Sequence, residues 1–262
     1  MARYNDLDMN NWKEYDDILT DSLWIFDKRD KSGAHNASYH GNFIPQIPNQ
    51  LFRRYTKKSD WILDPFVGGG TSLIEAQRLS RNAIGIELQE DVAKIAHDLV
   101  KQEKTKDFKG TIIVGDSRVV NIEERLKCFG ISKVQFVIYH PPYWDIIKFS
   151  DNEKDLSNCN TLEEFCQSFG EVIDNTSKYL EKNRYCACVI GDKYANSEIV
   201  PLGFCCMNLF LSRGFKLKAI LVKNFEDTKG KSNQKAIWRY RALASDFYLF
   251  KHEYIFVFKK IK

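Results

Sequence analysis

The segment that decides the fold is LDPFVGGGT at residues 63–71, which follows a short apolar run and precedes a segment of helical periodicity. A strand, a glycine-rich turn and a helix form the arrangement with which an α/β sheet presents its ligand crevice. Glycine has no Cβ, so the backbone of such a turn can come close to a bound small molecule. The segment therefore predicts a ligand pocket at the carboxyl end of its strand.

Outward from this segment, short β-branched runs alternate with longer stretches of helical periodicity. The predicted strands are Trp61–Leu63, Ala83–Glu87, Thr111–Val114, Val134–Tyr139, Cys186–Ile190, Leu217–Val222 and Tyr254–Phe258. The predicted helices are Thr71–Ser80, Glu90–Gln102, Asn121–Cys128, Leu162–Glu181 and Pro201–Arg213. This alternation is typical of a parallel sheet covered on both faces. We expect an α/β, Rossmann-like fold with a seven-stranded, mostly parallel sheet.

Two further strand ends carry polar side chains. Glu87 ends the second predicted strand, 19 residues after Gly68, where a carboxylate can accept hydrogen bonds from both hydroxyls of a ribose. Asp116 and Ser117 follow the third strand, where a carboxylate can accept from an adenine amino group. Each feature alone also fits a helix cap or a first-turn residue. Together, at three successive strand ends, they predict a nucleoside-type ligand.

The composition of the turn narrows the ligand further. The sequence lacks GxxxxGK[ST], the phosphate-gripping motif whose lysine contacts the β and γ phosphates. Pro65 and Phe66 make the turn rigid and apolar, which suits a pyrophosphate poorly. A sulfonium ligand without phosphates fits better.

The fourth predicted strand runs into HPPYW at residues 140–144. Two prolines hold the chain extended and supply no N–H groups, so carbonyl groups there project unpaired. An exocyclic amine on a base is a weak nucleophile, and accepting hydrogen bonds from both its protons localises its lone pair. The His140 side chain and the Pro141 carbonyl are candidates for the two acceptors, and Tyr143 for stacking on an extruded base. The alternative is a rigid strand-to-loop turn with aromatic residues in the core.

These motifs resemble a known family, the DNA amino-methyltransferases, which methylate adenine N6 or cytosine N4. DPFVGGGT at 64–71 resembles the family's cofactor motif DPFxGxGT, and HPPY at 140–143 resembles its catalytic motif [DNS]PPY. The segment HGNFIPQIP at 40–48 is similar to the one that covers the methionine end of the cofactor in this family. The resemblance implies a methyltransferase dependent on S-adenosylmethionine, with a catalytic set of His140, Pro141, Pro142 and Tyr143. It implies cofactor contacts from Phe43, Pro45, Asp64, Pro65, Phe66, Gly68, Gly70, Thr71, Glu87, Asp116 and Ser117.

His140 departs from the family, which has Asp, Asn or Ser at this position. A neutral imidazole nitrogen accepts a hydrogen bond, whereas an imidazolium cannot. We therefore expect activity to fall as the pH drops through the pKa of His140, and a flat rate from pH 8 to pH 5.5 would contradict this role. The substitution also removes the residue that usually distinguishes adenine from cytosine enzymes, so the base stays open.

The surface that reads DNA is small in this sequence. Only 68 residues separate Thr71 from His140, and sheet and helices consume them, so no recognition domain is inserted there. The candidate DNA contacts lie in the 144–160 loop and in a basic excursion at 223–246. They are Trp144, Lys148, Lys229, Lys231, Lys235, Arg239 and Arg241. A solvated loop is the alternative, and the small surface leads us to expect double-stranded DNA as substrate with a homodimer or a partner subunit supplying recognition.

Composition places few limits on function. The net charge of +4 indicates a polyanionic partner only mildly. Seven cysteines without paired CxxC units or histidines at zinc-ligand spacing predict free thiols and no metal. The absence of an apolar run long enough to cross a bilayer, and the charged N-terminal stretch, lead us to expect a cytoplasmic protein. We expect one structural domain, with an N-terminal extension at 1–55, a catalytic unit at 56–262 and a mobile basic loop at 223–246.

Two other functions remain open from the sequence. DPPY-type motifs on the same sheet also serve RNA methyltransferases that modify a base amino group, although such proteins normally carry a larger N-terminal RNA-binding domain. A catalytically inactive subunit that binds the cofactor and presents DNA to a partner is the second, because of His140.

Overall fold

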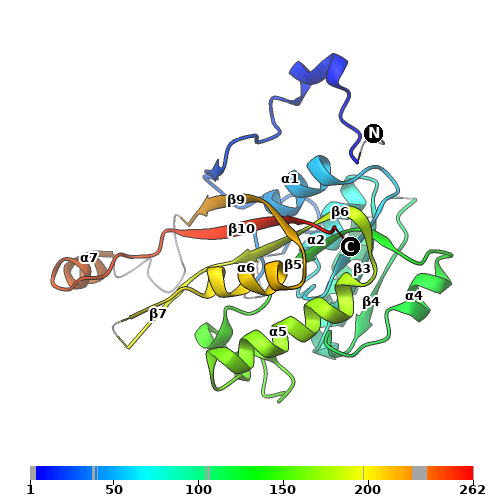
Figure 1. Ribbon diagram of the computed structural model, residues 1–262. Helices are drawn as coiled ribbons and strands as arrows, with labels where there is room; N and C mark the ends of the chain where they lie inside the picture. Colours follow the sequence, from blue (N-terminus) through cyan, green and yellow to red (C-terminus); the bar gives the residue numbers. More distant parts are fainter. Residues whose placement is uncertain are drawn as a thin grey trace.

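The computed structural model describes residues 4–261 except 37, 38, 40, 104, 106, 197 and 226–234. Its centre is an eight-stranded sheet in the order β1-β9-β10-β6-β5-β2-β3-β4 (Figure 1). The strands are β1 (Leu23–Trp24), β2 (Trp61–Asp64), β3 (Asn82–Glu87), β4 (Gly110–Val114), β5 (Val134–Tyr139), β6 (Leu180–Ile190), β9 (Lys216–Asn224) and β10 (His252–Lys259). The short strands β7 (Lys193–Ala195) and β8 (Glu198–Val200) pair separately as a hairpin.

Helices cover both faces of the sheet. They are α1 (Gln46–Tyr55), α2 (Thr71–Arg78), α3 (Glu90–Gln102), α4 (Glu123–Cys128), α5 (Leu162–Ser177), α6 (Leu202–Ser212) and α7 (Lys235–Leu243), with 3₁₀ turns at Met9–Tyr15, Trp144–Ile146 and Leu156–Asn158. Figure 1 shows α5 and α6 on one side of the sheet and α1 on the other. Among the described residues, no helix has the length and apolar character needed to cross a membrane.

The central strands are buried on both faces. Along β5, Val137 and Tyr139 join the core under α4, α5 and α6, whereas Phe136 and Ile138 join the core under α1 and α2. All four side chains are fully buried. Alternate residues of a strand face opposite sides of the sheet, so a run that is apolar at nearly every position specifies a strand covered on both faces.

The topology brings chain segments from both halves of the sheet to one edge. Strands β4, β3, β2, β5 and β6 are parallel, and β10 runs antiparallel between β6 and β9. The loops after β2, β3, β4, β5, β6 and β9, and the start of β10, therefore meet at the carboxyl edge of the parallel strands. This is where open α/β sheets bind their ligands.

The predicted fold class and all seven predicted strands are confirmed. The eighth strand, β1, forms one edge of the sheet beside β9 and has only two residues, so it is too short to leave a pattern in the sequence. The predicted helix Leu162–Glu181 is wrong at its end, because α5 stops at Ser177 and Leu180 already belongs to β6. Leu180 is fully buried and pairs with Val134, which favours the strand over a further helical turn.

The predicted loop at 223–246 is wrong at both its edges. β9 continues to Asn224, and residues 235–243 form α7. The sequence of α7, KAIWRYRAL, is rich in the helix formers Ala, Leu and Arg. Between these two elements, residues 226–234 lie outside the described residues.

Candidate active site

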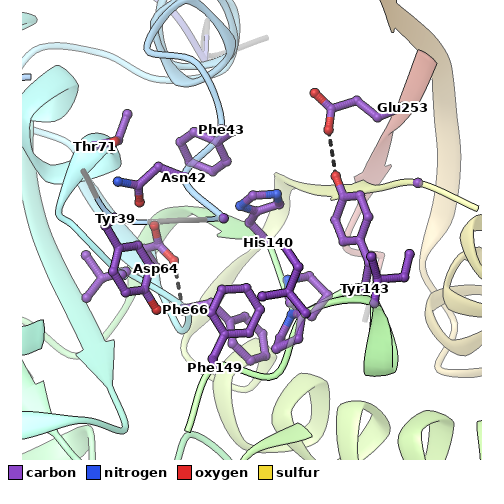
Figure 2. A pocket seen from close by; sticks show the side chains of 18 of the residues that line it. Tyr39, Asn42, Phe43, Asp64, Phe66, Thr71, His140, Tyr143, Phe149 and Glu253 are labelled. Atoms are coloured by element: carbon purple, nitrogen blue, oxygen red, sulfur yellow. Dashed lines mark hydrogen bonds between the residues drawn. The ribbon is translucent and has the colours of Figure 1, made fainter. Parts of the chain in front are cut away.

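One cavity of about 1170 Å³ lies at the carboxyl edge of the sheet. Its walls include the turn after β2 and the residues that follow β5, so the two predicted motifs face a shared space (Figure 2). Of the fifteen predicted cofactor and catalytic residues, thirteen line it: Phe43, Asp64, Pro65, Phe66, Gly68, Thr71, Glu87, Asp116, Ser117, His140, Pro141, Pro142 and Tyr143. The sequence thus predicted the two ends of this cavity.

The glycine-rich turn is held by the aspartate at the end of β2. Asp64 accepts a hydrogen bond from the Phe66 amide at 2.9 Å and another from the Ser72 hydroxyl. The carboxyl is almost fully buried, and this burial raises its pKa to about 7. Gly68 and Gly70 adopt φ values of 48° and 84°, a region that side chains with a Cβ rarely enter.

Glu87 joins this turn to the end of β3. Its carboxylate accepts from the amides of Gly68 and Gln89, each at 3.0 Å. These two bonds fix the orientation of the side chain, and burial raises its pKa. A carboxylate has about four lone-pair positions, so Glu87 keeps capacity to accept from a ligand.

The polar side chains after β4, Asp116 and Ser117, already form hydrogen bonds within the protein. The Ser117 hydroxyl donates to the Pro65 carbonyl at 2.6 Å, which ties this loop to the glycine-rich turn. The Asp116 carboxylate accepts from the Arg118 guanidinium, with Nη2 at 2.8 Å from Oδ2. Asp116 lines the cavity, but part of its accepting capacity is used within its own loop.

Two predicted cofactor residues are not in the cavity wall. Pro45 is buried at the start of α1. Gly70 faces α3, where an added Cβ would lie 3.4 Å from Ala96 and Val100. For Gly70 the left-handed φ and close helix packing also explain the glycine, so its contact with a cofactor stays a prediction.

At the other end of the cavity, His140 lies between two aromatic rings. The Phe43 ring packs at a centroid distance of 4.8 Å and the Tyr143 ring meets it edge-on at 5.7 Å and 85°. Burial lowers the pKa of His140 to about 4, with a smaller upward contribution from Glu253 and a smaller downward one from Lys223. The imidazole is therefore neutral at physiological pH and can accept a hydrogen bond.

The structure adds residues that the sequence patterns did not reveal. Tyr39 packs over the glycine-rich turn, where a Cβ on Gly68 would lie 2.8 Å from its ring, and stacks with Phe149 at 6.2 Å and 25°. Asn42 accepts from the Gly69 amide at 3.2 Å, while its buried Nδ2 has no hydrogen-bond partner among the described residues. Tyr39 and Asn42 belong to the stretch just before Phe43, so the family-like segment was the available signal.

Lys223 and Glu253 also line the cavity, beside Tyr143. Both come from the last two strands, far along the chain from either motif. Sequence spacing gives no signal for such a contact, because it depends on β10 lying between β6 and β9.

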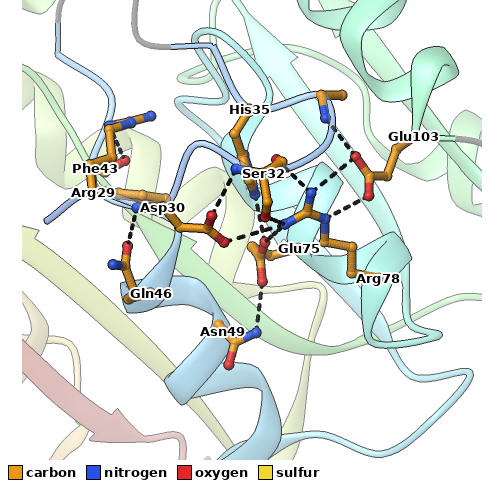
Figure 3. A network of polar contacts seen from close by, with 11 residues as sticks. Arg29, Asp30, Ser32, His35, Phe43, Gln46, Asn49, Glu75, Arg78 and Glu103 are labelled. Carbon is orange, nitrogen blue, oxygen red and sulfur yellow. Dashed lines mark hydrogen bonds and ion pairs between the residues drawn. The ribbon is translucent and has the colours of Figure 1, made fainter.

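The segment that covers the cavity is fastened to α2 by a polar network (Figure 3). His35 Nε2 lies 2.6 Å from the Glu75 carboxylate, and Arg78 Nε lies 2.6 Å from Glu103, which also accepts from the Ala34 amide. Asp30, His35 and Glu75 place three possible metal ligands within 4.8 Å of one another. The Arg78 guanidinium lies 3.3 Å from Glu75 and 3.5 Å from Asp30, so a cation already compensates these carboxylates.

The predicted DNA contacts lie outside the cavity wall or outside the described residues. Trp144 donates its indole N–H to the Cys159 carbonyl at 2.8 Å, and Lys148 is exposed beside Asp151. Arg239 and Arg241 are exposed on α7, whose Trp238 reaches the cavity. Lys229 and Lys231 lie outside the described residues, as does the side chain of Lys235.

Comparison with known proteins agrees with this geometry. Residues 2–98 match the family model for DNA methylases of the N6 and N4 type. This N-terminal part of the chain is similar to the DNA amino-methyltransferases. It is 36% identical over 100 residues to the Type II methyltransferase M2.DpnII of Streptococcus pneumoniae, covering 37% of this chain and 34% of that protein. It is 37% identical over 90 residues to the Type II methyltransferase M2.LlaDCHI of Lactococcus lactis subsp. cremoris, covering 34% and 31%. The match thus spans about a third of the length of each relative.

Solved structures confirm the fold. TrmN from Thermus thermophilus superimposes with a TM-score of 0.54 at 16% identity, covering 85% of this chain and 50% of that one. A SAM-dependent methyltransferase from Methanosarcina mazei gives a TM-score of 0.53 at 12% identity, covering 84% and 99%. The sheet and its helices thus have the Rossmann-like α/β fold of these two structures.

Proposed function

We propose that this chain is a DNA methyltransferase that transfers a methyl group from S-adenosylmethionine to an exocyclic amino group, adenine N6 or cytosine N4, of a flipped-out base. The observation that carries the proposal is the shared cavity, with the glycine-rich turn at one end and His140–Tyr143 at the other. Its volume of about 1170 Å³ exceeds the roughly 300–1000 Å³ of pockets for one drug-sized ligand. A cofactor and a base together account for such a space.

The residues at the cofactor end fit S-adenosylmethionine. Glu87 offers free acceptor positions for ribose hydroxyls, and Asn42 Nδ2 is a buried donor without a partner among the described residues. Proline and phenylalanine in the turn leave no phosphate-gripping loop. When bound, the cofactor supplies an electrophilic methyl group on a sulfonium sulfur. We assign its binding to Phe43, Asp64, Pro65, Phe66, Gly68, Thr71, Glu87, Asp116 and Ser117.

The residues at the other end prepare the amine. The neutral His140 imidazole and the Pro141 carbonyl accept hydrogen bonds from the two amino protons, which localises the nitrogen lone pair. Pro142 keeps the carbonyl of Pro141 fixed, and Tyr143 stacks on the base. The partly buried setting of His140 supports this role, because it keeps the ring unprotonated over the physiological range.

DNA contacts are assigned to the surface around the cavity mouth. α7 carries the exposed Arg239 and Arg241 and reaches the cavity through Trp238. The 144–160 loop supplies Lys148 and the Phe149 ring, which also lines the cavity. The small area of these elements supports a homodimer or a partner subunit as the source of sequence recognition. The match of residues 2–98 to the DNA methylase family model supports DNA as the substrate.

The test is methyl transfer from tritiated S-adenosylmethionine to duplex DNA or to tRNA, with wild type and His140→Ala in parallel. The proposal predicts label in DNA that falls about a hundredfold in the variant, the scale for one lost polar contact at a reacting centre. Label only in tRNA would establish an RNA enzyme. Cofactor binding without label in either DNA or tRNA would establish an inactive subunit.

A further inference from the structure

A buried ion pair forms part of the cavity wall beside the catalytic motif. Lys223 Nζ lies 3.1 Å from Glu253 Oε1, and the two side chains are only 7% and 5% exposed. The residues face each other across β9 and β10, as direct partners in the strand register. Both line the cavity.

The second oxygen of this carboxylate anchors the catalytic tyrosine. The Tyr143 hydroxyl donates to Glu253 Oε2 at 2.6 Å (Figure 2). Burial, followed by the nearby Glu253 carboxylate, holds the pKa of Tyr143 well above its usual range, so the hydroxyl keeps the proton that it donates. Lys223 thus binds one oxygen of Glu253 and Tyr143 the other, which leaves the carboxylate in one orientation.

One edge of the Tyr143 ring packs closely against the backbone at Gly191. A Cβ added to Gly191, the residue after β6, would lie 2.9 Å from Tyr143 Cε2. The φ of Gly191 is not in the left-handed region. The structural reason for a glycine there is therefore the close approach of the Tyr143 ring. The ring is therefore confined at its edge by Gly191 and at its hydroxyl by Glu253.

An ion pair in this position is costly for stability alone. Removing two charges from water costs several kcal/mol each, and well-packed apolar residues of similar size often stabilise a fold equally well. Lys223 and Glu253 also lie far along the chain from both sequence motifs. Its placement at a cavity wall, with one member bound to a residue of the catalytic motif, indicates a role in the site.

We propose that Glu253, with its buried charge compensated by Lys223, is a positioning residue that together with Gly191 holds the Tyr143 ring edge-on to His140 in the orientation that receives the base. The stacking of Tyr143 on a base rests on the proposed function, whereas the position of the Tyr143 ring does not. Lys223 and Glu253 act through Tyr143 and take no part in bond making.

Three variants separate anchoring from charge and from folding. Lys223→Met with Glu253→Gln removes both charges and keeps an acceptor for the Tyr143 hydroxyl. Lys223→Met with Glu253→Leu removes both charges and the acceptor, leaving an apolar pair. Tyr143→Phe removes only the hydroxyl. None of the three leaves an unpaired buried charge, so all three are expected to fold, and melting temperatures check this.

The first readout does not require activity. The NMR shifts of the His140 ring protons, assigned with His140→Asn, report the adjacent Tyr143 ring. We expect wild-type shifts in the Gln variant and displaced shifts in both the Leu variant and Tyr143→Phe. Wild-type shifts in all three folded variants would overturn the proposal. Because this readout is independent of methyl transfer, it holds even if the proposed function fails.

The second readout is kinetic. Because the Tyr143 ring stacks on the base in the proposed function, partial loss of ring order predicts a roughly tenfold lower kcat in the Leu variant and in Tyr143→Phe, with unchanged affinity for S-adenosylmethionine. The Gln variant should restore kcat, and combining Tyr143→Phe with the Leu pair should add no further loss. Additive losses, or equal activity of the Gln and Leu variants, would contradict the anchoring role.

Discussion

The Gly68 amide donates to the Glu87 carboxylate across 3.0 Å, so the end of one strand orients the glycine-rich turn that follows its neighbour. The same carboxylate holds the Gln89 amide. Two backbone bonds from two loops thus aim one acidic side chain at the cavity. The cofactor end is assembled by this bond rather than by the glycine-rich turn alone.

Glu87→Gln should weaken binding of S-adenosylmethionine. An amide keeps one acceptor oxygen and turns the other into a donor, so the amide of Gly68 or Gln89, or a ribose hydroxyl, loses its acceptor. Hydrogen bonds to a charged group contribute about 1.5–3 kcal/mol, which corresponds to roughly 10- to 150-fold in Kd. Isothermal titration calorimetry with S-adenosylmethionine measures this Kd. Glu90→Gln, an exposed residue at the start of α3, is the matched control, and equal affinities in both variants would argue against Glu87 as a ligand.

The part of the rate that depends on His140 should be independent of pH from 8 to about 5 and fall as the pH drops through about 4. The sequence alone led us to expect a fall nearer neutrality, and the structure corrects this because burial lowers the pKa of His140 to about 4. Protonation below that value removes the acceptor. His140→Asn keeps an acceptor that does not titrate, so the fall attributable to His140 should disappear in single-turnover rates. A wild-type midpoint near 6.5 would show that the ring is not buried as described.

Stability should depend on pH through Asp64. Its pKa is raised from 3.8 to about 7 in the folded protein, so the folded state holds a proton that the unfolded state releases. The stability that this proton contributes is fully present below pH 3.8, the pKa of Asp64 in the unfolded chain, and is lost as the pH rises through about 7. Asp64→Asn stays uncharged, so its stability relative to wild type should increase between pH 4 and pH 7, by up to about 1.4 kcal/mol per pH unit. Urea unfolding at several pH values tests this, and a pH-independent difference would argue against a protonated Asp64.

Arg239→Ala and Arg241→Ala should weaken DNA binding and its salt dependence. Each phosphate contact contributes about 0.9 to the slope of log K against log salt concentration, so each variant should lower the slope by about one. Fluorescence anisotropy with labelled duplexes measures this. Arg125→Ala is the control, because Arg125 is exposed on α4, on the opposite side of the molecule from α7 (Figure 1). A slope lowered equally by all three variants would point to general charge rather than to α7.

The strands and the two motif loops were predictable because their signals are local. β5 is apolar at nearly every position. Asp64 shapes the turn by accepting a hydrogen bond from Phe66, two residues further along. In both cases a short window of sequence contains the residues that cause the local structure. Glu253 and Lys223 were not predictable, because their approach to Tyr143 depends on β10 inserting between β6 and β9. At Gly70 the sequence cannot separate two reasons for a glycine, because one required by φ and by helix packing has the same signal as one that admits a ligand. The pKa of His140 also follows only from burial, which no motif reports.

The most direct test of the central claim, that one cavity brings a sulfonium methyl group to a base amine, is nucleoside mass spectrometry. DNA would be taken from a methylation-free host expressing either wild type or His140→Ala. The account predicts N6-methyldeoxyadenosine or N4-methyldeoxycytidine with the wild type and at least a large reduction with the variant. Unmodified DNA from cells containing folded wild-type protein that binds S-adenosylmethionine would contradict it.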